Sequence, residues 1–119
     1  MPLRAEYSAF IEDLLSPFGA VSVRRMFGGG GVYHEGVMFA LIADDTLYLK
    51  ADAETEQDFA AEGSRPFEYR GKTRPISLSY WQVPERLYED ADELAEWARR
   101  AFAAALRAHK PAGGRKAQD

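Results

Sequence analysis

Between Val21 and Lys50 the hydrophobic pattern repeats every second residue, which is the period of a β-strand. Short connections at residues 34–36 and 43–46 interrupt this pattern, and their Gly and Asp residues suit tight turns. Strands joined by connections this short pair with their neighbours in antiparallel fashion. The segment therefore predicts an antiparallel meander.

Helical patterns flank the predicted strands. Apolar residues recur every three or four positions near the start of the chain, which predicts a helix over about residues 3–16. Residues 55–61 are expected to form a short helix that ends at Gly63. A long amphipathic helix follows Asp90, since Asp90 and Glu93 have the spacing of a capping box.

Two further strand candidates, residues 67–69 and 76–83, lie between the second and third predicted helices. The order α, several β, α, ββ, α predicts an α+β fold in which helices cover one side of an antiparallel sheet. We expect one domain over residues 1–110, because 119 residues suffice for a single core. Residues 111–119 are rich in glycine and basic residues, and a disordered tail is expected there.

The composition excludes several classes of function. The 15 basic and 19 acidic residues give a net charge of −4, which disfavours a nucleic-acid footprint covering the whole domain. The absence of cysteine excludes disulfides, zinc fingers, iron–sulfur sites and thiol nucleophiles. We find neither an apolar signal core nor a run long enough to span a membrane, so a cytoplasmic protein is expected.

No residue pattern indicates an enzyme, a cofactor or a metal site. The glycines at 28–31 are followed by a strand pattern, which favours a β-bulge or a close backbone crossing over a phosphate loop. His34 and His109 are the only histidines, and we expect both to be exposed to solvent. A small-ligand or enzymatic site near the glycines and His34 is the least favoured alternative.

One strand pattern is apolar on both faces. Simple alternation places Met38, Ala40 and Ile42 on one face of the sheet and their apolar neighbours in the strand on the other face. Trp81 is expected to add a large apolar side chain to the face that carries Met38. A sheet with one face in water carries polar residues there, so we expect a partner to cover the second face through Met38 and Trp81.

Four basic residues cluster within residues 65–74, at Arg65, Arg70, Lys72 and Arg74, before and within the connection between the last two predicted strands. Arg24-Arg25 and the basic residues near the C-terminus are two further clusters. The simplest interpretation of these clusters is that their charged side chains face solvent and bind no partner. Direct contact with nucleic acid through residues 65–74 and the tail is the alternative, with Tyr80 and Trp81 available for stacking.

Several motifs together resemble one protein family. They are Arg24-Arg25-Met26-Phe27-Gly28-Gly29, residues 36–45, Leu47-Tyr48-Leu49-Lys50, Pro66-Phe67, Tyr69, Lys72, Pro75, Ser79-Tyr80, Val83-Pro84-Glu85 and Trp97-Ala98. Across about residues 8–108, and most specifically from Met26 to Lys50, the chain resembles the TfoX N-terminal domain family.

The resemblance implies an α-β(3)-α-β(2)-α fold like that of the secretion chaperones. It also implies regulation of bacterial competence genes together with the cyclic-AMP receptor protein, and it brings no catalytic or metal residues. Full-length members add a helical C-terminal domain, whereas a stand-alone domain is expected here. We therefore predict a dimeric, non-catalytic protein-interaction domain that modulates transcription. Its predicted contact residues are Met38 and Trp81, with a basic rim of Arg24, Arg25, Arg70, Lys72 and Arg74.

Overall fold

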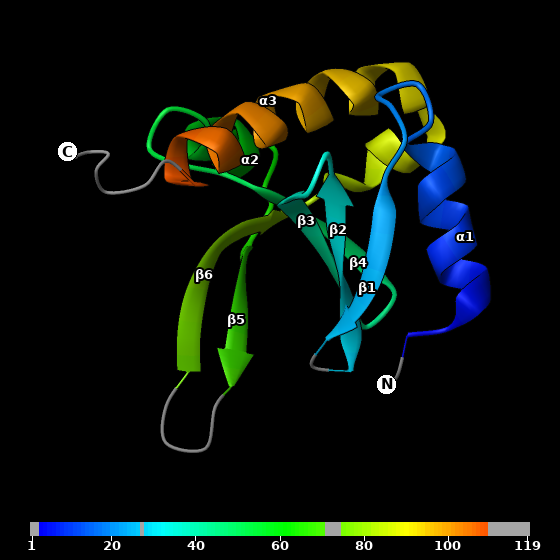
Figure 1. The fold of residues 1–119 in the computed structure, drawn as a ribbon. Coiled ribbons are helices and arrows are strands. Elements are labelled where there is room, and N and C mark those ends of the chain that lie inside the picture. Colours follow the sequence, from blue (N-terminus) through cyan, green and yellow to red (C-terminus); the bar gives the residue numbers. More distant parts are fainter. Residues whose placement is uncertain (1–2, 27, 71–74, 110–119) are drawn as a thin grey trace, which may run out of the picture.

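The computed structural model describes residues 3–26, 28–70 and 75–109, with the side chains of 69–70, 75–78 and 109 left aside. The tail expected at 111–119, and Lys72 and Arg74, lie outside the described residues. In chain order, the elements in Figure 1 are α1 (Ala5–Leu14), β1 (Ser22–Met26), β2 (Gly29–His34), β3 (Val37–Ala43), β4 (Thr46–Lys50), α2 (Glu56–Ala61), β5 (Pro66–Arg70), β6 (Pro75–Gln82), the 3-10 helix η1 (Glu85–Glu89) and α3 (Ala91–His109).

The strands of the described chain form one antiparallel sheet in the order β1-β2-β3-β4-β6-β5. The predicted α+β class is confirmed. Four strands precede α2, whereas three were expected from the family resemblance. The additional strand arises because Gly28, at a φ of +78°, lies in a turn that separates β1 from β2.

The glycines after this turn allow neighbouring strands to approach closely. A Cβ atom at Gly29 would collide with the backbone carbonyl oxygen of Ile42, and one at Gly30 would lie 2.8 Å from Leu3 Cδ2. Both glycines belong to β2, so no helix begins here to bind a phosphate. Of the two alternatives expected at these glycines, the close backbone approach is confirmed at Gly29 and Gly30, and the register shift of β2 with β3 lies beyond them, between Val32 and Tyr33.

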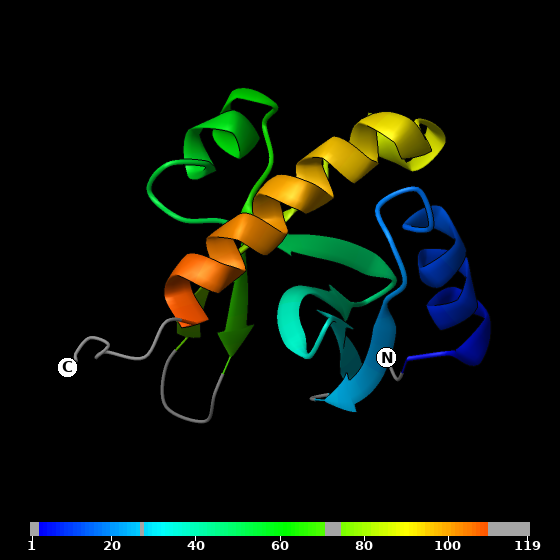
Figure 2. The ribbon, with the colours of Figure 1, turned by 45° about the horizontal axis from the view of Figure 1, so that its top comes forward.

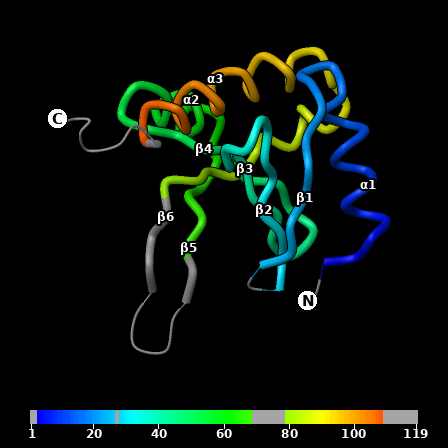
Figure 3. The backbone as a smooth tube through the Cα atoms, in the orientation of Figure 1, coloured from blue at the N-terminus to red at the C-terminus, as the bar shows by residue number. Residues whose placement is uncertain are grey.

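Helices α2 and α3 lie on one side of the sheet, and α3 crosses it diagonally (Figures 1 and 2). The backbone trace shows the β5–β6 and β1–β2 hairpins descending on either side of the centre of the sheet (Figure 3). The core under α3 contains Phe39, Leu47, Leu49 and Leu94, each with no exposed surface. Burial of such side chains contributes roughly 1.5–3 kcal/mol each.

Helix α3 begins as its capping pattern predicts. The backbone N–H of Glu93 donates to Asp90 Oδ1 at 3.1 Å, which satisfies one of the free amides of the first turn. The apolar stripe of this helix turns toward the sheet and includes Leu94, Ala98 and Ala101, all buried. No helix of the described chain is long and apolar enough to cross a membrane.

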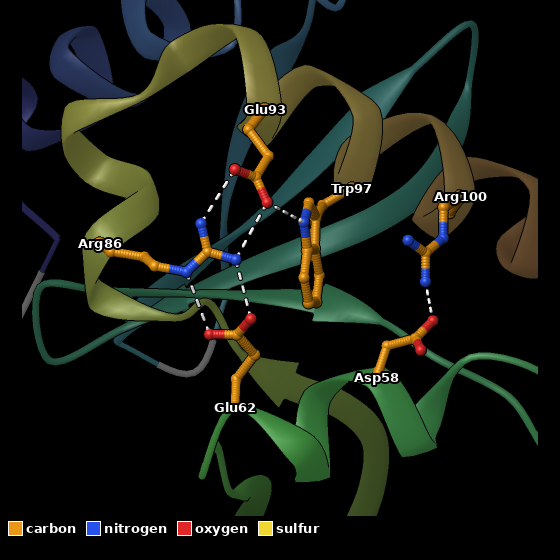
Figure 4. Close-up of polar contacts among 6 residues, drawn as sticks. All are labelled: Asp58, Glu62, Arg86, Glu93, Trp97 and Arg100. Carbon is orange, nitrogen blue, oxygen red and sulfur yellow. Dashed lines mark hydrogen bonds and ion pairs between the residues drawn. The ribbon is translucent and has the colours of Figure 1, made fainter.

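An ionic network ties η1 to both neighbouring helices (Figure 4). The Arg86 guanidinium donates two hydrogen bonds to Glu62, after α2, and two to Glu93 at the start of α3. Trp97 Nε1 donates to the same Glu93 carboxylate at 3.3 Å. Beside this network, Arg100 of α3 pairs with Asp58 of α2. These bonds fix α2 against α3 over the covered face of the sheet.

The prediction of an exposed His34 is wrong. Its ring lies 4.7 Å from the ring of Phe18 and 4.9 Å from that of Phe102, measured between centroids. Its Nδ1 lies 2.7 Å from the carbonyl oxygen of Ala20, which places the ring proton on Nδ1. The histidine closes one end of the aromatic core, so its contacts are structural.

Candidate functional site

The side of the sheet opposite α2 and α3 carries no helix of the described chain (Figures 1 and 2). We call this side the open face. Strand alternation and register place on it a set of mostly aromatic and apolar side chains, namely Arg24, Met26, Tyr33, Met38, Leu41, Tyr48, Lys50, Phe67 and Tyr80. Leu41 is buried without belonging to the main core, so the open face has an apolar cluster of its own.

An irregularity in β3 decides which residues reach the open face. Val32 of β2 pairs with Ala40, and the next residue of β2 pairs with Met38, so Phe39 is an additional residue in β3. Met38 lies on the open face as expected. Ala40 and Ile42, expected beside it, lie on the covered face and are buried in the main core. The expected alternation was wrong because it assumed a strand without a bulge.

Trp81 also lies on the covered face rather than beside Met38. It pairs with the core residue Leu49, and its ring lies 6.2 Å from that of Phe59 in α2. Its strand neighbour Tyr80 takes the open-face position. Trp81 is therefore covered by the chain's own helices, and the expectation that a partner covers it is corrected.

Gly31 sits beneath the centre of the open-face cluster. A Cβ atom there would lie 3.1 Å from Met26 Cε, from Met38 Sδ and from Tyr33 Cε1. Three side chains from three different strands thus meet above one glycine. The absence of a side chain at Gly31 creates the space that they fill.

Two cations lie over tyrosine rings on the open face. The Arg24 guanidinium is 4.8 Å from the ring centre of Tyr33, and the Lys50 ammonium is 5.2 Å from that of Tyr80. Cation–ring contacts of this kind contribute about 0.5–1 kcal/mol at exposed sites and more when desolvated. They hold both cations against the aromatic surface.

Burial shifts the pKa of several open-face groups. It raises the pKa of Tyr80 to about 12, and it also raises the pKa of Tyr48, with a further contribution from the charge of Asp44. Burial lowers the pKa of Lys50, an effect that the charge of Asp52 opposes. Both tyrosines therefore resist ionisation at alkaline pH more than a free phenol does.

The structure separates the residues of the predicted basic rim. Arg24 lies on the open face, whereas Arg25 on the covered face donates to the Leu3 carbonyl oxygen at 2.6 Å and so anchors the N-terminal segment. Arg70 ends β5, and Lys72 and Arg74 belong to the segment outside the described residues.

Six open-face residues were not predicted as contact residues, namely Met26, Tyr33, Leu41, Tyr48, Lys50 and Phe67, and Tyr80 was expected only as a surface for stacking on nucleic acid. Tyr48 and Lys50 alternate with the buried Leu47 and Leu49, and for these two residues that alternation was the available signal.

A groove of about 550 Å³ lies away from the open face, between α1, η1 and the β3–β4 turn. Two of its acids already have partners, because Asp45 pairs with Arg4 and Glu62 with Arg86. Within the described part of the chain, no group of three or more His, Asp or Glu side chains could hold a metal ion.

These features define a two-layer α+β domain with helices on one sheet face and an uncovered aromatic surface on the other. The chain belongs to the TfoX N-terminal domain family, whose model matches residues 13–105. It is similar to the DNA transformation protein TfoX1 of Aliivibrio fischeri, with 32% identity over 73 residues that cover 61% of this chain and 35% of that protein. It is also similar to the protein Sxy of Escherichia coli, with 25% identity over 96 residues that cover 81% of this chain and 46% of Sxy.

The matched region thus spans less than half the length of either relative. Neither relative's name denotes an enzyme.

Proposed function

We propose that this chain is a non-catalytic regulatory domain of the cytoplasm that docks a protein on its open face. The observation that carries the proposal is the uncovered cluster of Tyr33, Met38, Tyr48 and Phe67. Tyrosine, methionine and arginine are enriched in protein interfaces, and acidic residues are depleted there. The strands of the open face match this composition, since Glu68 is the one acidic residue among all six.

The similarity to a DNA transformation protein supports a role in the control of DNA transformation. In this role the domain modulates transcription, and the protein contact on its open face is needed for that modulation. Because the match covers only part of each relative, the activities of the relatives' other segments are not assigned to this chain.

The partner that we propose is a second copy of the chain. Arg24 and Lys50 give the open face a positive charge, which favours an apolar surface edged by acids. Helix α1 displays such a surface, because Phe10 is 44% exposed and has exposed acids four residues before it and three after it, at Glu6 and Asp13. Docking of α1 on the open face of a second copy would pair these complementary surfaces.

Sedimentation velocity over a range of concentrations tests this docking. Met38→Glu and Phe10→Glu should each shift the chain to the monomer, since each places a carboxylate in the apolar contact. Leu106→Glu is the matched control, because Leu106 is equally exposed on α3, at 43%, and lies outside the proposed contact. If all three variants associate like the parent chain, docking through these surfaces is wrong.

The regulatory role has a separate test. The Met38→Glu and Leu106→Glu alleles are introduced into the natural host, and transformation frequency and transcript levels are measured. The proposal expects a loss with Met38→Glu and none with Leu106→Glu. Equal frequencies in both strains would contradict it.

Contact with single-stranded nucleic acid is the second candidate function. It is supported by the Arg24–Tyr33 and Lys50–Tyr80 pairs, since nucleic-acid platforms combine aromatic stacking with cations. Fluorescence anisotropy with a labelled oligonucleotide should then show affinity that falls steeply with salt. An absence of binding at low salt would exclude this function.

A further inference from the structure

A pocket of about 300 Å³ lies at one end of the open face. Its wall combines Tyr33 and Met38 from the β2–β3 hairpin, Lys50 and Tyr80 from the ends of β4 and β6, and Ala105 and Ala108 from the last turns of α3. This volume is at the lower limit for pockets that bind small molecules. The pocket therefore suits a ligand of few heavy atoms.

Lys50 is the one cation among the residues that line this pocket, and none of those residues carries a carboxylate. No ion pair joins Lys50 to an acid of the described chain, and residues 69–78 of the adjacent hairpin contain no acid. Asp52 favours the charged lysine through space, but its carboxylate is 2.7 Å from Arg107 Nε and also accepts the backbone N–H of Glu54. An ammonium that is partly desolvated without a counter-ion gains most from a bound anion.

The remaining wall offers hydrogen-bond donors and an apolar surface. Tyr33 and Tyr80 each carry a phenol group that can donate a hydrogen bond. Met38 is a flexible apolar side chain, and Ala105 is buried. The pocket thus combines one positive charge, neutral donors and an apolar wall.

We propose that this pocket binds a small monocarboxylate, with its carboxylate on Lys50 and its apolar part against Met38 and Ala105. One cation balances the single charge of a carboxylate, whereas a phosphate dianion would keep an unbalanced charge. The site goes beyond the docking function, and only one of its two sources of carboxylate requires a docked protein. The carboxylate has two possible sources, a free molecule or an acidic side chain of a docked protein.

Benzoate is the first probe, because it carries one carboxylate on a small apolar ring. NMR titration of the isotope-labelled full chain should show saturable shifts at the Lys50 side chain, the Met38 methyl group and the Tyr80 ring. Benzyl alcohol, which is similar in shape and uncharged, should bind at least tenfold more weakly. The Lys50 ammonium should also titrate at a higher pH when benzoate is bound, since an anion favours its charged form.

Variants separate the role of Lys50 from general effects of charge. Lys50→Met should weaken benzoate at least tenfold, and Lys50→Arg should retain binding because it keeps the charge. Arg99→Met is the matched control, since Arg99 is an exposed cation of α3 that pairs with Glu96. If Lys50→Met unfolds the chain, Tyr80→Phe serves instead and should weaken benzoate several-fold.

A second arm uses the blocked tripeptide acetyl-Leu-Glu-Leu-amide under the same conditions. Binding of benzoate at Lys50 identifies a free carboxylate as a ligand, and binding of the peptide alone identifies an acidic side chain as the source. The proposal is overturned if neither probe shifts Lys50, or if benzyl alcohol binds as tightly as benzoate. Titrations at protein concentrations where the chain is monomeric keep this result separate from the docking test.

Discussion

Tyr48 of β4 and Phe67 of β5 meet edge to face, with ring centroids 5.0 Å apart, although β6 lies between their strands. Strands two places apart in a flat sheet are about 9.5 Å apart, so these rings reach toward each other across β6. A double-mutant cycle with Tyr48→Ala and Phe67→Ala should give a coupling energy of about 0.5–1.5 kcal/mol in urea unfolding. A coupling indistinguishable from zero would show that the rings do not meet in solution.

The two sides of the sheet should respond differently to truncation. Trp81→Ala should destabilise the fold by about 3 kcal/mol, because the indole packs between the sheet and Phe59. Met38→Ala should cost about 1 kcal/mol, since Met38 lies on the open face and is partly exposed. Urea unfolding of both variants checks the order, and an equal or reversed effect would contradict the assignment of faces.

Met38 and Trp81 also illustrate which parts of the fold could be predicted from the sequence and which could not. Capping by Asp90, the long amphipathic helix and the antiparallel strands depend on local spacing, which a single sequence displays. The faces of β3 depend on the additional residue Phe39, and the bulge exists only in relation to β2. The face of Trp81 is decided by the pairing of β6 with β4, a long-range contact.

Strand alternation alone does not tell which of the two faces the helices will cover. Tyr33 follows the apolar Val32 and Tyr80 precedes the apolar Trp81, so either residue of each pair was compatible with a core position. The position of His34 was mistaken for a similar reason, because its partners Phe18 and Phe102 are distant in sequence. The aromatic and cationic composition of the open face is thus a property of the folded chain.

Glycine substitutions in β2 should differ according to what the added methyl group meets. Gly29→Ala should destabilise strongly, by about 3 kcal/mol or more, because its Cβ would collide with the Ile42 backbone. Gly31→Ala should cost less, about 1–2 kcal/mol, since it meets the movable ends of Met26 and Met38. Thermal unfolding compares the two variants, and a smaller effect at Gly29 would refute the close approach of the strands.

Stability at high pH should depend on Tyr80. Its pKa is about 12 in the folded chain and 10.0 for the free group, so the folded state favours the neutral phenol. This contribution is fully present below pH 10 and is lost as the pH rises toward 12. Absorbance of tyrosinate against pH should show a late-titrating group that disappears in Tyr80→Phe. Titration of that group near pH 10 would contradict its burial.

Stability at low pH should depend on the network around Arg86. Hydrogen bonds from Arg86 lower the pKa of Glu62 and of Glu93, each below the ordinary value of 4.5. Their contribution is therefore present above pH 4.5 and is lost as the pH falls through the folded values. Carboxylate titration by carbon-13 NMR should show both values moving back toward 4.5 in Arg86→Met. Unchanged titration in that variant would mean that Arg86 does not hold these carboxylates in solution.

Docking of α1 of one copy on the open face of a second copy can be followed by NMR dilution of the labelled full chain, with amide and methyl shifts recorded from high to low concentration. Concentration-dependent shifts are expected at Met38, Tyr48 and Phe10, and none around Leu106 on α3. Shifts confined to other surfaces, or none at any concentration, would contradict this docking.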